Sequence, residues 1–218
     1  MGKNSKSQMR YNIGNAQTIG EMEFQSNYFA TAEKPNLVAA AADGGIDHIN
    51  GRKAAVIAVE QMMGALAGGI LNREHFCEIF KSASSKIIQN INDYIYGGKT
   101  PNLSLSVICV SDGRAYFYTV GSIRIYVYDD KNIRDINGLG FHNVYDIKAA
   151  DNFMMISQGG YEALTPMELL QFLRREDDKY RRSDNRAYDK AVGLIEEINK
   201  KNIKNAKNST IVLFEGNV

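Results

Sequence analysis

The sequence of 218 residues has no tryptophan, only three prolines and only two cysteines. Two cysteines form one pair at most, which excludes a disulfide-rich secreted scaffold, so Cys77 and Cys109 are expected to be buried free thiols in a reducing compartment. An excess of charge is also missing, because 26 basic and 25 acidic side chains leave a net charge of +1. The field of the whole protein therefore favours neither nucleic acid nor a membrane as a partner.

No uninterrupted apolar run reaches the ~20 residues that a membrane-spanning helix needs. The N-terminus is polar and lacks the apolar stretch of a secretion signal. Lys6 also stands where an acylation signal requires Ser or Thr. These absences predict a cytoplasmic protein in which residues 1–13 form a solvated tail and residues 14–218 form one domain.

Hydrophobic periodicity predicts an alternation of strand-rich and helix-rich segments. Asn72 and Thr165-Pro166 are expected to start helices, and Ser111-Asp112-Gly113-Arg114 is expected to form a hairpin turn. The order of the segments favours a layered α+β architecture over a doubly wound parallel sheet. The expected strands are 15–20, 28–32, 37–42, 103–110, 115–120, 124–128, 152–157 and 210–214, and the expected helices are 51–66, 72–96, 167–175 and 187–202.

Four segments in a fixed order resemble the motifs of a known family. The clearest is Ala41-Ala42-Asp43-Gly44-Gly45, which follows an apolar strand and precedes His48, Gly51 and a helix. The other three are Val120-Gly121-Ser122-Ile123-Arg124, the strand that ends in Ser157-Gln158-Gly159, and Lys207-Asn208-Ser209-Thr210. Together they resemble the metal-dependent protein phosphatases of the 2C type, the PPM family, over about residues 15–214.

This resemblance implies a four-layer αββα sandwich, in which two antiparallel sheets are flanked by helix pairs. In the family, two Mn²⁺ or Mg²⁺ ions held by carboxylates activate a water that attacks phosphorus. The matching positions form a vestigial metal pocket at Asp43, Gly44, Gln158 and Lys207, together with Asn27, because the family's first motif, an Arg followed by Asn-Glu-Asp, would fall on Met22 and Gln25-Ser26-Asn27. Only Asp43 keeps a family acid, since Asn27 and Gln158 are neutral and Lys207 is positively charged.

The charge of this pocket argues against metal-dependent catalysis. Hard divalent cations need carboxylate ligands, and an ammonium about 4 Å from such an ion is repelled by roughly 8 kcal/mol at an effective dielectric near 20. Met22 also stands where the family has its phosphate-holding arginine. We therefore expect no catalytic residue and no metal cofactor, and any Mn²⁺ or Mg²⁺ that did bind would lie at Asp43 and Gly44. Lys207 could pair with Asp43 in place of a metal, or it could point to solvent while Asp43 only caps the next helix.

Two other kinds of site are less well supported. Asp43, Asp47 and His48 could form a different metal site, although acids at the start of a helix usually cap it. An N-terminal nucleophile hydrolase would share the layered fold, but it needs Thr, Ser or Cys at the mature N-terminus, and Met1-Gly2 offers none.

Three functional hypotheses remain. The first is a non-catalytic pseudophosphatase of Ser/Thr phosphosignalling that binds a protein partner, either a phosphoprotein or a kinase. The second is a weak Mn²⁺- or Mg²⁺-dependent Ser/Thr phosphatase with an altered metal site. The third is a structural or assembly subunit that uses only the fold, for which a homodimer is one option. Neither nucleic acid nor a membrane is an expected partner.

Overall fold

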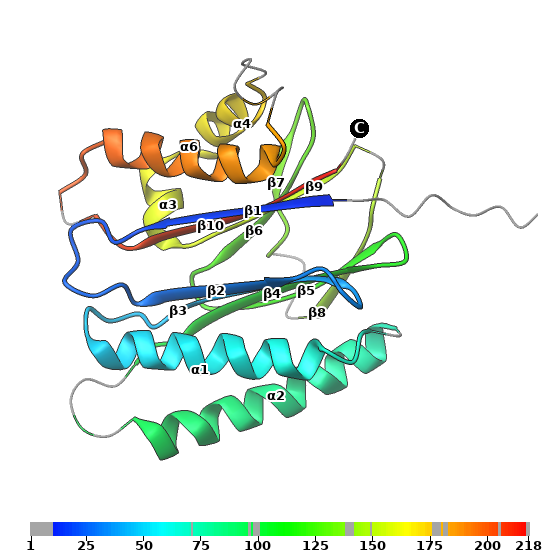
Figure 1. The fold of residues 1–218 in the computed structure, drawn as a ribbon, viewed down its shortest axis with the longest axis vertical. Coiled ribbons are helices and arrows are strands. Elements are labelled where there is room, and N and C mark those ends of the chain that lie inside the picture. The colour runs from blue at the N-terminus through cyan, green and yellow to red at the C-terminus, as the bar shows by residue number, and fades with distance from the viewer. Residues whose placement is uncertain are drawn as a thin grey trace, which may run out of the picture.

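Two five-stranded antiparallel sheets form the middle layers of the molecule (Figure 1). The computed structural model describes residues 11–70, 72–95, 97, 101–137, 142–148, 150–175, 180, 183–204 and 206–216. Sheet A has the order β1 (Tyr11–Thr18), β10 (Ser209–Gly216), β9 (Asn152–Ile156), β6 (Arg124–Tyr128) and β7 (Ile133–Asp135). Sheet B has the order β2 (Asn27–Ala32), β3 (Leu37–Asp43), β4 (Ser104–Ser111), β5 (Arg114–Val120) and β8 (His142–Asp146).

Helices cover the outer face of each sheet (Figure 1). Helices α1 (Ile49–Leu66) and α2 (Arg73–Tyr94) lie on sheet B, and α3 (Gln158–Ala163), α4 (Pro166–Leu173) and α6 (Arg186–Lys200) lie on sheet A. As predicted, Asn72 caps α2 by accepting the His75 N–H at 2.9 Å. Thr165 starts α4 with a reciprocal hydrogen-bonded box to Glu168, and Pro166 occupies the first turn.

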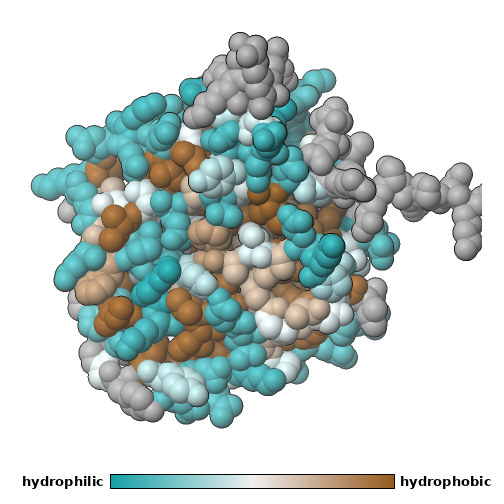
Figure 2. Space-filling model, in the orientation of Figure 1, coloured by the Kyte–Doolittle hydropathy of each residue, from teal (hydrophilic) through white to brown (hydrophobic). Residues whose placement is uncertain are grey.

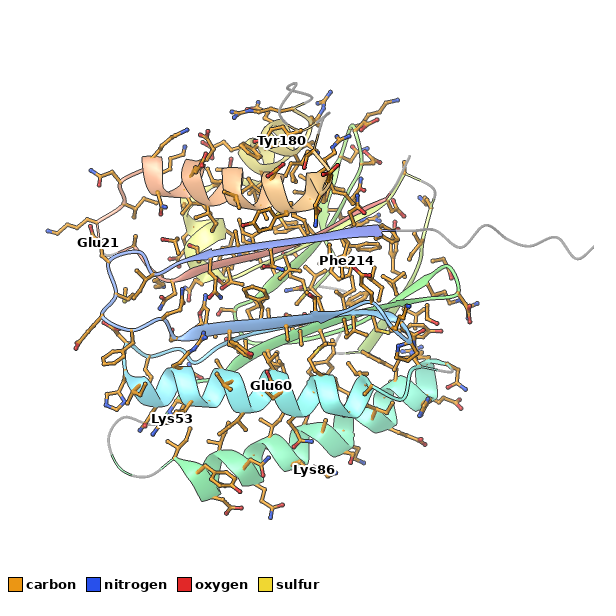
Figure 3. All side chains as sticks on the ribbon, viewed as in Figure 1. Glu21, Lys53, Glu60, Lys86, Tyr180 and Phe214 are labelled. Atoms are coloured by element: carbon orange, nitrogen blue, oxygen red, sulfur yellow. The ribbon has the colours of Figure 1, made fainter. Side chains whose placement is uncertain are left out.

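Apolar side chains fill all three spaces between the layers. Between the sheets lie Phe117, Phe153 and Phe214, each almost completely buried. Figure 3 labels Phe214 in this central layer and Lys86 on the outer helical layer. Burial of each phenylalanine stabilises the fold by about 1.5–3 kcal/mol, so the sandwich is held by its apolar layers. The expected αββα architecture is confirmed.

Most expected elements are present within a few residues of their predicted bounds, but several details differ. Strand β1 begins at Tyr11, so residues 11–13 belong to the sheet and not to the expected tail, whose residues 1–10 lie outside the described part. On the predicted helix 72–96, Ile88 is 63% exposed, because its neighbour Ile87 takes the inward position and adjacent residues point about 100° apart on a helix. Cys109 is buried as expected, whereas Cys77 is only half-buried. No helix among the described residues combines the length and apolar character needed to cross a membrane.

Candidate functional site

Polar residues from both sheets converge at one end of the sandwich. Asn27 opens β2 and lies directly opposite Asp43, the last residue of β3, so the two side chains share one face of sheet B. Residues two positions along, Phe29 and Ala41, pack in the layer between the sheets, which shows that this face points inward. Sheet A contributes Ser157 after β9 and Asn208 before β10. We call Ser26, Asn27, Asp43, Ser157 and Asn208 the polar cluster.

Hydrogen bonds within the polar cluster join the two sheets. The Asn27 amide donates from Nδ2 to Ser157 Oγ at 2.9 Å and to the Asn208 carbonyl at 3.3 Å. Ser157 Oγ donates to the same carbonyl at 3.2 Å and accepts the Thr210 N–H at 2.9 Å. Asn208 Nδ2 in turn donates to Ser26 Oγ at 3.0 Å. The five side chains are buried, so these hydrogen bonds between the sheets are shielded from water.

Asp43 is the one carboxylate of the polar cluster and is only 9% exposed. Its Oδ1 accepts the Gly45 N–H at 2.8 Å and the Ser26 hydroxyl at 3.4 Å. Burial raises the pKa of Asp43, and the Gly45 N–H, the Ser26 hydroxyl and the charge of Lys207 oppose that rise. The neighbouring Gly44 carbonyl, the other expected metal ligand, accepts the Asn102 N–H at 3.1 Å.

Lys207 and Gln158 turn toward a residue that the sequence motifs did not include. Lys207 Nζ lies 3.1 Å from Glu162 Oε1, and Gln158 Nε2 donates to the same oxygen at 2.6 Å. The hypothesis of a direct Lys207–Asp43 ion pair is therefore wrong, although the charge of Lys207 still acts on Asp43 over a longer distance. Glu162 lies one helical turn after Gln158 on α3, which places its carboxylate next to the Lys207 ammonium.

The side chains of Asp47 and His48 accept hydrogen bonds from nearby backbone N–H groups. The two carboxylate oxygens of Asp47 accept the N–H groups of Glu23 and Phe24 at 3.0 and 2.7 Å. His48 caps α1 by accepting the Asn50 N–H on Nδ1 at 3.1 Å, so Asp43 does not cap this helix. In the described ranges, no three His, Cys, Asp or Glu side chains are grouped to hold a metal ion. The alternative metal site at Asp43, Asp47 and His48 is therefore wrong.

The remaining motif positions are also held by local contacts. The Ser122 N–H donates to Ser104 Oγ at 3.0 Å, and the hydroxyl groups of Ser122 and Ser104 also form a hydrogen bond, at 3.0 Å. The guanidinium of Arg124 lies 3.9 Å from the centre of the Tyr161 ring. Sequence reasoning missed Arg52, which donates to the Asn27 carbonyl and stacks over Tyr28; only its place in the first turn of α1 hinted at this role.

The residues of the pocket do not fit a pair of divalent cations. Two such ions need several carboxylates, and the polar cluster has one, whose Oδ1 already accepts two hydrogen bonds. Asn27 turns its amide nitrogen, a donor, toward sheet A, and Gln158 is committed to Glu162. The positive charge of Lys207 further disfavours cations nearby.

A pocket of about 260 Å³ opens beside the polar cluster, next to the pair of Lys207 and Glu162. Ile198, Ile203 and Lys204 are among the residues that line it. Glu21, which Figure 3 labels in the loop after β1, lines it as well. The lining thus combines charges of both signs with apolar side chains.

Comparison of the structure with solved proteins identifies the fold. It matches a serine/threonine phosphatase of S. agalactiae with a TM-score of 0.80 and 14% identity, over 94% of this chain and 99% of that chain. PppA, a regulatory component of the type VI secretion system in Pseudomonas aeruginosa, matches with a TM-score of 0.79 and 13% identity, over 95% and 98%. The serine/threonine phosphatase PstP/Ppp of Mycobacterium tuberculosis matches with a TM-score of 0.68 and 15% identity, over 94% and 98%.

By sequence, no family model matches the chain, and no curated protein does either. The fold is nevertheless that of the PPM-type Ser/Thr phosphatases along nearly the whole chain, as the sequence motifs predicted. At these low identities the comparison establishes the shared fold.

Proposed function

We propose that this chain is a pseudophosphatase: a PPM-type phosphatase fold that does not hydrolyse phosphate esters with metal ions and instead binds a protein partner. The observation that carries the proposal is the polar cluster. The positions that should hold two metal ions contain a single carboxylate, and the neighbouring amides and hydroxyls already hydrogen-bond to one another across the two sheets.

Manganese binding and phosphatase activity test the catalytic half of this proposal. Calorimetric titration with Mn²⁺ should give no saturable heat for the wild-type protein, and p-nitrophenyl phosphate should not be hydrolysed above the buffer rate. The matched variant Asn27→Asp/Gln158→Asp/Lys207→Asp restores three acids around Asp43, and it should gain saturable Mn²⁺ binding. Hydrolysis by the wild type that depends on Mn²⁺ and is lost in Asp43→Asn would instead establish a weak phosphatase.

For the partner, we propose a phosphoprotein or a kinase that docks at the end of the sandwich with the polar cluster. The adjacent pocket supports this choice, because its lining combines the apolar Ile203 with Lys204 and Lys207, which suits a phosphorylated side chain and its apolar neighbours. Bound phosphate would compete with Glu162 for the Lys207 ammonium.

Fluorescence anisotropy with a pool of labelled phosphoserine and phosphothreonine peptides tests this docking. We expect the phosphorylated pool to bind at least fivefold more tightly than its unphosphorylated twin, and we expect Ile203→Asp to remove the difference. Ile88→Asp is the matched control, since it changes an exposed isoleucine on α2, outside the pocket. Equal binding of both pools would leave the structural-subunit hypothesis as the better one.

A further inference from the structure

The four edge strands of the two sheets are protected to very different degrees. Exposed strand edges pair with other strands unless charged side chains, proline or short length prevent it. Strand β7 has only three residues, and two of them, Arg134 and Asp135, are charged. Strand β8 ends in Asp146, which forms a salt bridge with Arg114 at 3.2 Å. On β2, Arg52 covers the first carbonyl. Strand β1 is the longest of the four, with eight residues and no charge or proline.

The hydrogen-bonding direction along β1 follows from its neighbours. The Thr210 carbonyl accepts the Ser157 N–H at 3.0 Å, so Thr210 faces β9 and turns away from β1. Gln17 is the residue of β1 opposite Thr210. In an antiparallel pair such a residue points its own N–H and C=O away from the ladder. Because the direction alternates along the strand, Asn15 also presents both groups at the outer edge of sheet A.

At the outer edge of β1, the Ile13 carbonyl accepts a hydrogen bond, whereas the outward groups of Asn15 and Gln17 have no partner in the described part of the chain. Asn185 Nδ2 donates to the Ile13 carbonyl at 3.1 Å, which agrees with an outward direction at odd-numbered residues. Within the ranges that the structure describes, no hydrogen bond uses the outward N–H or C=O of Asn15 or Gln17. The second half of β1 is therefore an unpaired template of four backbone groups.

Exposed apolar side chains flank this template. Ile19 follows β1 and is 40% exposed, and Tyr188 on α6 is 50% exposed. Tyr188 lies three residues after Asn185, so it sits on the side of α6 that reaches the edge of β1. Figure 1 shows α6 directly over β1, and Figure 2 shows pale and brown residues across the middle of this face.

We propose that two copies of this chain pair through β1 to form a C2 dimer with a continuous sheet. A two-fold axis at Ala16 sets Asn15 opposite Gln17 of the partner subunit, and each such pair exchanges two N–H···O bonds. The same register brings Ile13, whose outward carbonyl accepts the Asn185 amide, beside the partner's Ile19. A second copy suits this edge because antiparallel self-pairing matches every donor with an acceptor, and an uncharged strand does not repel its own copy.

Sedimentation equilibrium and amide exchange on the full chain test the dimer. The wild type should have twice the 24.3 kDa mass of one chain at tens of micromolar. Gln17→Pro removes the outward N–H without touching the β1–β10 ladder, and it should raise the dissociation constant at least tenfold. Gln17→Ala is the matched control: it loses the same side-chain contact to Thr210 but keeps the N–H, and it should remain dimeric.

Amide exchange keeps the test decisive if Gln17→Pro folds poorly. The Asn15 and Gln17 amides should be protected in the wild type at high protein concentration and should exchange freely on dilution, and Ile19→Asp should abolish that dependence. A wild type that sediments as a 24.3 kDa monomer at several hundred micromolar would overturn the proposal. So would equal dissociation constants for Gln17→Pro and Gln17→Ala.

Discussion

The substitution Asn27→Asp adds a second carboxylate to the polar cluster, and its repulsion by Asp43 can be measured as a fall in the free energy of unfolding. Asn27 is completely buried and lies opposite Asp43, where facing side chains begin about 5 Å apart. Two carboxylates at that distance repel by about 3 kcal/mol at an effective dielectric near 20. The two hydrogen bonds that the amide donates contribute about 1 kcal/mol each and are also lost. We therefore expect the free energy of unfolding to fall by about 3–5 kcal/mol at neutral pH without metal.

Urea unfolding in EDTA at several pH values measures this loss. Mutual repulsion raises the folded-state pKa of both carboxyls above their unfolded values. The destabilisation should therefore grow as pH rises through the raised pKa values and fade as pH falls toward about 4. Asn27→Ala is the control, since it loses the two hydrogen bonds without adding charge and should be less stable by about 2 kcal/mol at every pH. If Asn27→Asp were as stable as the wild type at pH 7 in EDTA, the pocket would already accommodate a second charge and the reasoning would fail.

Three further predictions concern other buried groups. Because burial raises the pKa of Asp43, its ionised form weakens the folded state at neutral pH. Asp43→Asn should therefore melt at a higher temperature than the wild type at pH 7, with a difference that shrinks toward pH 4. The buried pair of Lys190 and Glu215, 2.6 Å apart, should make Lys190→Met less stable by about 3–5 kcal/mol in urea, and Glu215→Leu in the same chain should restore most of the loss. Burial raises the pKa of the Cys109 thiol to about 12, so a colorimetric disulfide reagent should modify Cys77 alone in the native protein and both cysteines in urea.

The sequence was sufficient to predict helices and turns that begin at a residue type characteristic of such positions. The caps at Asn72 and Thr165 formed as predicted, because a side-chain oxygen satisfies N–H groups of the first helical turn. The predicted turn between β4 and β5 has Asp112 and Gly113 at φ values of 49° and 74°, the left-handed region that an Asp-Gly pair tolerates. Strands β7 and β8 were missed, because β7 has only three residues and β8, His142–Asp146, has mostly polar residues and little apolar signal.

The motifs named Asn27 and Asp43, which the fold brings to one end of the sandwich, but they did not predict the contacts there. These two residues meet because strand pairing sets them opposite each other. The partner of Lys207 could not be predicted, since Glu162 belongs to no motif and meets Lys207 only through the packing of α3 against the start of β10. The β1 edge also went unnoticed, because edge position depends on strand order, which neither composition nor periodicity reveals.

If the proposed function is right, the scarcity of carboxylates and the presence of amides in this pocket are physically coupled. Several carboxylates at one inter-sheet position are stable only when cations neutralise them, so a chain that gives up the ions must also replace the acids. Here Asn27 and Asn208 fill that space with amides whose nitrogens donate to Ser157, to the Asn208 carbonyl and to Ser26, while their side-chain oxygens stay without a partner among the described residues, and one acid is present. Asp43 is tolerated because the Gly45 N–H and the Ser26 hydroxyl bind its Oδ1 and Lys207 offsets its charge. Replacing one of these residues by an acid, without changing the others, should therefore destabilise the fold before it gives the pocket any affinity for metal.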